Sequence, residues 1–214
     1  MDFSSAPVTY SLIAINVIIS FIGFFNPDFM DKAIMWPYRV KRAKQFYRFL
    51  TSGFVHADFM HLLFNMISFY FLGRSIEYYF TEYGLGGKVS YLLLYFFGLI
   101  ISDIPSYIKN QDNYHYRTLG ASGAVSAVIF ACILFNPWGT ILIYFIPMPF
   151  IVFAFLYLAY CIYSSKKNIG NQNHDAHLWG SLFGLVFTAA LIGILAPHLM
   201  PAILQELSHP HFGT

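Results

Sequence analysis

The sequence predicts an all-α polytopic membrane protein with six transmembrane helices. Hydrophobic residues make up 57% of the 214 residues and charged residues only 10%, whereas soluble domains carry about 25% charged residues. The mean hydropathy is +0.58. The apolar residues fall into six runs, most of them close to the roughly 20 residues that a spanning helix needs. Lipid is therefore the expected surroundings of most of the chain.

The first three apolar runs are expected to form spans at residues 7–25, 59–80 and 89–108. The N-terminal stretch MDFSSAPVTY has an acid but no Lys or Arg, unlike the basic start of a signal peptide. We therefore expect the first run to be retained as a span. The second run carries Arg74 and Glu77 near its end. The third is expected to break late, at Asp103 and Pro105, because proline removes a backbone donor.

The last three apolar runs predict spans at residues 121–135, 147–163 and 175–195. The fourth span is short and is stopped by Asn136-Pro137. The fifth should begin after Pro147 or Pro149, since a helix tolerates proline at its start and not in its interior. The chain contains no internal repeat, low-complexity tract or composition shift, so residues 1–214 are expected to form a single domain.

The long connection between the first two spans, residues 26–58, interleaves basic and aromatic residues. Such mixtures suit the membrane interface, where aromatic rings lie at headgroup level and charged ends reach water. We interpret this segment as a folded, partly membrane-immersed loop; the alternative is a solvated basic loop. The net charge of +2 is too small to indicate a nucleic-acid partner, and the two cysteines, Cys132 and Cys161, lie in apolar runs and form no disulfide framework.

The stretch GASG places Ser122 between two glycines at the start of the short fourth span. Fourteen helical residues rise about 21 Å in a hydrocarbon core of about 30 Å, so the hydroxyl would lie about 10 Å below the near surface. Gly120 and Gly123 would let a substrate backbone approach it. The helix start also offers unpaired N–H groups for a developing oxyanion. The alternative is that these small residues serve helix packing.

Three further polar residues lie where the second and sixth spans begin. Six spans bring the starts of the second, fourth and sixth to the same membrane face, so His61, Asn65 and His177 can converge on Ser122. Gly180 and Gly184 follow His177 at a spacing of four, which allows the fourth and sixth helices to pack closely. His177 would then serve as the base for Ser122. The alternatives are a histidine satisfied in the core and polar contacts between helices.

Together these motifs resemble the rhomboid intramembrane serine proteases. The resemblance extends over most of the chain, from the first span to the sixth, and rests on the order of its motifs. These are Tyr47-Arg48, HADFMHLLFNM at residues 56–66, FLGRSIE at residues 71–77, GASG at residues 120–123 and AHLWGSLFG at residues 176–184.

The resemblance implies a compact, bacterial-type six-span bundle and a role for each motif. Ser122 would be the nucleophile and His177 the base, while His61 and Asn65 would stabilise the oxyanion. Structural roles would fall to Arg48 and to the glycines of the two Gly-containing motifs. Glu77 would tie the first loop to the second span. The substrates would be single-span membrane proteins with a small residue before the cleaved bond, and neither a metal nor an organic cofactor would be needed.

One residue departs from the family pattern. Four residues after the nucleophile many rhomboids carry a tyrosine that packs on the catalytic imidazole, and here this position is Ser126. His177 must then be oriented by another group or be held more loosely. Asp175 is two residues from His177, a spacing that points it away on a helix. The predicted machinery is therefore a Ser–His dyad.

The sequence thus predicts an intramembrane serine endopeptidase in the lipid bilayer, with a prokaryotic plasma membrane as its expected location and a homo-oligomer left open. The first alternative is a weak or inactive rhomboid-like protein that binds membrane helices. A transporter is a further alternative, although the chain shows no inverted repeat. A metalloprotease is the last, with ligands drawn from His56, His61, His174, His177 and Asp175, although no H-E-x-x-H motif is present.

Overall fold

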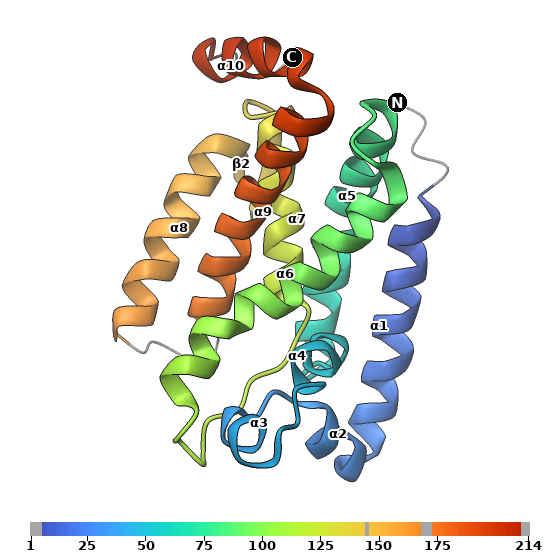
Figure 1. The fold of residues 1–214 in the computed structure, drawn as a ribbon, viewed down its shortest axis with the longest axis vertical. Helices are drawn as coiled ribbons and strands as arrows, with labels where there is room; N and C mark the ends of the chain where they lie inside the picture. Colours follow the sequence, from blue (N-terminus) through green and yellow to red (C-terminus); the bar gives the residue numbers. More distant parts are fainter. Residues whose placement is uncertain (1–5, 144–145, 168–172, 211–214) are drawn as a thin grey trace.

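The computed structural model describes residues 6–143, 146–167 and 173–210 as a helical bundle (Figure 1). Six of its helices overlap the six expected spans. They are α1 (Pro7–Phe25), α5 (Phe59–Glu82), α6 (Gly87–Asn110), α7 (Ser122–Phe135), α8 (Phe150–Lys167) and α9 (His174–Leu195).

Among the described residues, four helices are long and apolar enough to cross a bilayer: α1, α6, α8 and α9. With the helical bundle, they confirm the predicted class, an all-α polytopic membrane protein. Helix α7 is apolar but only 14 residues long, and α5 carries Arg74, Glu77 and Glu82. That all six helices cross the membrane stays a prediction.

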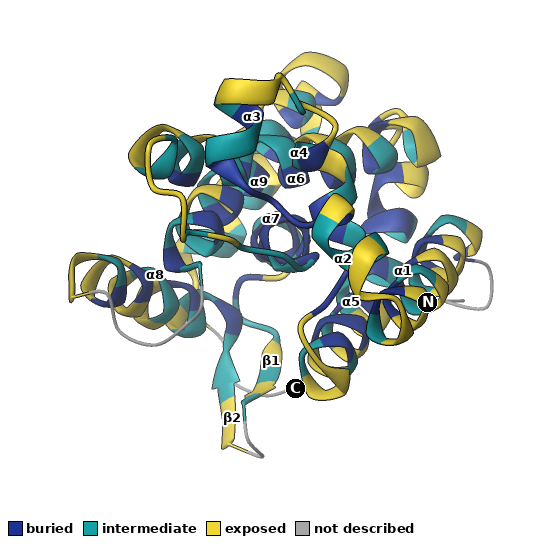
Figure 2. Ribbon diagram, turned by 90° about the horizontal axis from the view of Figure 1, so that it is seen from below, coloured by how far each residue is buried: buried dark blue, intermediate teal, exposed yellow. Residues whose placement is uncertain are grey.

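Helix α7 lies in the middle of the bundle, and the other long helices surround it (Figure 2). Most of its residues are buried, from Gly123 to Ile133 with one exception. The sequence SGAVSAVIFACILF explains this position, because small residues allow neighbouring backbones to approach from several sides. The start of the helix lies among its neighbours, and Ser122 is partly buried there.

The closest approach in the bundle is between α7 and α9. A Cβ atom added at Gly180 would overlap the carbonyl oxygen of Gly123, and one added at Gly184 would overlap that of Ala127. The close packing expected from this small-residue row is therefore present. It fixes the relative depth of the first turns of α7 and α9.

The first connection is folded, as predicted. It contains α2 (Pro27–Ala33), α3 (Pro37–Ala43), α4 (Arg48–Thr51) and the 3-10 turn η1 (Ser52–Phe54). An antiparallel bridge between Met35 and Thr118 joins it to the segment before α7. Its immersion in the membrane stays a prediction.

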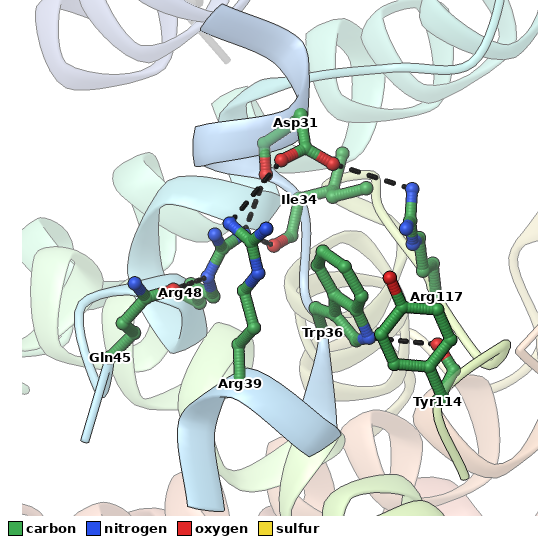
Figure 3. A network of polar contacts seen from close by, with 8 residues as sticks. All are labelled: Asp31, Ile34, Trp36, Arg39, Gln45, Arg48, Tyr114 and Arg117. Carbon is green, nitrogen blue, oxygen red and sulfur yellow. Dashed lines mark hydrogen bonds and ion pairs between the residues drawn. The ribbon is translucent and has the colours of Figure 1, made fainter. Parts of the chain in front are cut away.

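Arg48 holds this connection together from a fully buried position (Figure 3). Its Nη1 donates to the carbonyl oxygens of Asp31 at 2.8 Å and Ile34 at 2.6 Å, and its Nε donates to Gln45 Oε1 at 2.7 Å. The planar guanidinium can serve several acceptors at fixed angles, which an ammonium group cannot do. The structural role that the resemblance implied for Arg48 thus has a physical basis in the loop.

Glu77 differs from its expected role as a tie to the first loop. Its carboxylate accepts hydrogen bonds from Val8 N at 2.9 Å and from Thr9 N and Oγ1, both at 2.8 Å. These backbone donors lie at the start of α1, where a helix leaves N–H groups unpaired and where negative charge is favourable. Glu77 therefore caps α1 from within α5.

The expected late break of the third span is wrong, because α6 continues to Asn110 with Pro105 inside it. Asn173, at the start of α9, holds the helix on both sides of the proline. Its Nδ2 donates to Asp103 Oδ1 at 3.2 Å, and its Oδ1 accepts from Ser106 Oγ at 2.7 Å. This support from a neighbouring helix offsets the single backbone bond that proline removes.

A two-stranded antiparallel hairpin was not expected in an all-α fold. It pairs β1 (Thr140–Ile143) with β2 (Ile146–Pro149), in the register Thr140 opposite Pro149. Both candidate start prolines of the fifth span lie in β2, an edge strand that tolerates them. Helix α8 begins at Phe150, directly after Pro149, which is the later of the two predicted starts and three residues after the predicted bound at 147.

Candidate active site

Ser122 and His177 lie in direct hydrogen-bonding contact. His177 Nε2 is 2.8 Å from Ser122 Oγ. Ser122 is the first residue of α7, and His177 lies in the first turn of α9. The glycine contacts between these helices bring the two turns together, so residues 55 positions apart become neighbours.

The turn before Ser122 places free backbone donors beside its hydroxyl. Gly120 has a φ of 117°, a conformation that strongly favours glycine, and its N–H donates to Ser52 O at 2.9 Å. The first α-helical bond of α7 is the one from Val125 N to Ala121 O. The N–H groups of the first turn, including that of Ser122, therefore have no acceptor within the helix.

His61 lies against this turn. A Cβ atom at Gly120 would be 2.8 Å from His61 Nε2, so the ring occupies the space that any larger residue would need. His61 Nδ1 accepts from Ala57 N at 3.5 Å. A neutral imidazole that accepts at Nδ1 carries its proton on Nε2. The Nε2–H group therefore faces the segment that leads into Ser122.

Asn65 lies one turn further along the same face of α5, as predicted. Its Nδ2 donates to His61 O at 3.1 Å, and the side chain is buried. One of its two amide protons is used in this bond, which leaves the second for another acceptor. The described contacts thus join Asn65 to His61 rather than directly to Ser122.

His56 holds the same turn from the other side, a role that the sequence did not suggest. The fully buried ring lies 2.8 Å from Ser20 Oγ through Nδ1, and Nε2 accepts from Ala121 N at 3.4 Å. Burial, followed by the nearby His61, lowers the pKa of His56 to about 3. The ring is therefore neutral near pH 7, as its acceptor role at Nε2 requires. The sequence had suggested His56 only as a candidate metal ligand.

Tyr157 of α8 stacks on the His177 imidazole. The ring centroids are 6.2 Å apart and the planes are inclined by 21°. Its hydroxyl lies 3.2 Å from Ser126 Oγ. The tyrosine missing at position 126 is thus supplied by another helix, and Ser126 is small enough to leave room for it. The sequence contains 16 tyrosines, and no spacing along the chain connects this one with His177.

A small cavity adjoins Ser122. Its volume is about 10 Å³, close to the minimum for one water molecule. Ser102, Asp103, Gly120 and Asn173 contribute to its lining. The side chains of Ser102, Asp103 and Asn173 offer both donors and acceptors, so the cavity suits a hydrogen-bonded water next to the hydroxyl.

Asp175 is engaged away from His177, in agreement with its predicted direction. Its carboxylate accepts from Ser165 Oγ and lies 3.4 Å from Lys109 Nζ. The described arrangement at Ser122 is therefore a serine and a histidine with an aromatic support.

Fold and site together define a class: a helical integral membrane protein with a partly buried serine–histidine pair where two closely packed helices begin. The family model described as the Rhomboid domain matches residues 43–194. The chain therefore belongs to the rhomboid family. The compact six-span and bacterial-type form that the resemblance implied stays a prediction.

Curated relatives carry the same family name. RHOMBOID-like protein 12, mitochondrial, from Arabidopsis thaliana is 28% identical over 177 residues, which are 78% of this chain and 53% of that protein. Presenilin-associated rhomboid-like protein, mitochondrial, from Homo sapiens is 29% identical over 64% of this chain and 35% of its own length. Rhomboid protease GlpG from Yersinia pestis is 26% identical over 74 residues, which are 34% of this chain and 27% of that protein. The chain thus spans about half or less of the length of these three relatives.

Proposed function

We propose that this chain is an intramembrane serine endopeptidase that cleaves transmembrane segments through a Ser122–His177 dyad. The observation that carries the proposal is the 2.8 Å hydrogen bond between His177 Nε2 and Ser122 Oγ at the start of α7. Membership of a family that includes a protein named rhomboid protease supports the same reaction class.

The proposed reaction begins when His177 Nε2 takes the proton of Ser122 as Oγ attacks a substrate carbonyl carbon. The N–H groups at the start of α7 and the Nε2–H of His61 would stabilise the resulting oxyanion, with the free amide proton of Asn65 as a further donor. His177 then gives the proton to the leaving amine as the C–N bond breaks. A water from the adjoining cavity hydrolyses the ester at Ser122 and restores the dyad.

The proposed substrates are single-span membrane proteins. A helical peptide bond is shielded by its own hydrogen bonds, so segments that contain Gly, Pro or polar residues should unwind and react most readily. The apolar helices and the family place the protein in a lipid bilayer. A prokaryotic plasma membrane stays a proposal, since relatives include mitochondrial as well as bacterial proteins. Formation of a homo-oligomer also stays a proposal.

The decisive experiment for this function is covalent labelling of Ser122. Detergent-solubilised protein is treated with a fluorophosphonate, and the modified residue is identified by mass spectrometry, beside a cleavage assay with a single-span substrate and a chelator. We expect the label on Ser122, no label in His177→Ala, and cleavage that is indifferent to the chelator. Cleavage that survives in Ser122→Ala contradicts the dyad. Substrate capture by wild type with neither cleavage nor label favours the binding-only alternative.

Tyr157 provides a prediction about how His177 is oriented. Tyr157→Leu removes the stacked ring, and an aromatic contact contributes about 0.5–1.5 kcal/mol beyond its buried area. We expect kcat/KM for cleavage to fall up to about tenfold. Tyr157→Phe keeps the ring and should stay within about threefold of wild type.

Ser126→Ala is the matched control for Tyr157. It removes the same Ser126–Tyr157 hydrogen bond from the other side and leaves the stacked ring in place. It should behave like Tyr157→Phe. Equal kcat/KM values for Tyr157→Leu and Tyr157→Phe, in proteins of equal thermal stability, refute the positioning role.

A further inference from the structure

A second group of chemistry-bearing side chains shares His177 with the proposed dyad. Cys161 of α8 and His174 and His177 of α9 each offer one ligand atom, and these atoms lie within 4.8 Å of one another. Cys161 is fully buried, and His174 is 5% exposed. The two histidines are three residues apart and therefore share one face of α9, which packs on α8.

The three side chains match the ligand preference of zinc. On coordination the Cys161 thiol would release its proton. The resulting thiolate and the two neutral imidazoles are soft to intermediate donors, which select Zn²⁺ and similar ions over Mg²⁺ and Ca²⁺. Zn–N and Zn–S bonds measure about 2.0–2.3 Å. Ligand atoms up to 4.8 Å apart leave a central point about 3 Å from each, so rotamer changes that move each atom by less than about 1 Å would close the site.

We propose that Cys161, His174 and His177 form a binding site for Zn²⁺ or a cation of similar chemistry, and that occupation of this site switches off His177. Binding requires only these three side chains. The inhibitory effect rests on the proposed function, because it acts through the base of the dyad.

The inhibition follows from the electron pairs of the imidazole. A neutral histidine has one unprotonated ring nitrogen. A metal on Nε2 replaces the hydrogen bond to Ser122 Oγ. A metal on Nδ1 leaves the proton on Nε2, which can then no longer accept the proton of Ser122. Either coordination removes the general base, so the effect does not depend on which nitrogen binds.

The site differs from the metalloprotease alternative drawn from the sequence. That ligand set also contained His56 and His61, which lie against the turn before Ser122. Its Asp175 contacts Ser165 and Lys109 instead. Cys161 does not belong to that set. A catalytic metal would make cleavage depend on zinc, whereas the proposed site makes zinc an inhibitor. The two hypotheses therefore predict opposite effects of zinc on substrate cleavage.

The test uses metal-free full-length protein in detergent, titrated with Co²⁺ and Zn²⁺. Co²⁺ reports a cobalt–thiolate bond by its absorption, and Zn²⁺ should displace it. We expect this absorption in wild type and in Cys132→Ala, the matched control that removes the other buried thiol, and its loss in Cys161→Ala. Zn²⁺ should inhibit cleavage by wild type and Cys132→Ala. The inhibitory concentration should rise at least tenfold in Cys161→Ala, with each variant compared to its own uninhibited rate.

Each outcome decides one part of the proposal. Absence of the cobalt–thiolate absorption in folded wild type, or its survival in Cys161→Ala, overturns the site. Absorption with cleavage unaffected at saturating zinc overturns the effect on His177. If wild type cleaves no substrate at all, the proposed function fails, while the cobalt spectrum still decides whether the site exists. His174→Phe, which keeps a ring beside Tyr160, should lose metal affinity as Cys161→Ala does.

Discussion

Ser122→Ala and His177→Ala are each expected to lower the rate of substrate cleavage by on the order of 10⁴-fold or more. The first removes the attacking oxygen. The second removes the only group hydrogen bonded to that oxygen among the described contacts, so the serine stays protonated. Because the two act as a unit, the double variant should be no slower than the slower single variant. Single-turnover cleavage in liposomes measures all three rates.

Ser181→Ala is the control for this experiment. Ser181 is a buried serine one turn after His177, and its Oγ donates to His177 O at 2.8 Å. Its loss removes one hydrogen bond, worth about 1 kcal/mol, without removing a reacting atom. Cleavage should then stay within about tenfold of wild type. Multiplicative losses in the double variant, or substantial cleavage by Ser122→Ala, would show that the two residues do not act as a dyad.

The helices of the bundle were largely predictable because their signals are local. Apolar runs bounded by proline and polar residues placed the ends of α1, α7 and α9 at Phe25, Phe135 and Leu195, where the structure has them. The pairing of Ser122 with His177 was also predictable. It needed only the parallel directions of the fourth and sixth spans and the glycine row that sets their depth.

The remaining features depend on contacts between distant segments. Tyr157 supports His177 from a different helix, and Glu77 caps α1 across 68 residues. Pro105 is tolerated because Asn173 holds both sides of it. No periodicity or spacing encodes these pairs. The sequence showed that position 126 lacked an aromatic ring, but only the packing of α8 on α9 identifies its replacement.

The same dependence on packing makes the glycines of α9 the most sensitive structural positions. Gly180→Ala and Gly184→Ala each insert a methyl group against a backbone carbonyl of α7, where a side chain cannot rotate away. Overpacking of this kind costs about 1–3 kcal/mol, and a rigid neighbour places the cost at the upper end. The helices must separate, which lengthens the Ser122–His177 hydrogen bond. We expect large losses of both thermal stability and cleavage.

Gly193→Ala is the matched control in the same helix. Apart from the adjacent residues and the backbone of α9 itself, no described atom lies within 4 Å of a Cβ added there, and alanine favours a helix over glycine by about 1 kcal/mol or less. The same substitution should therefore be neutral or stabilising at residue 193 and destabilising at residues 180 and 184. Thermal unfolding in detergent, with cleavage measured alongside, compares the three variants. Equal stability of Gly184→Ala and Gly193→Ala would mean that the close contact between α7 and α9 does not determine the stability of the fold. Another cause would then be needed for the equal depth of Ser122 and His177 in the bundle.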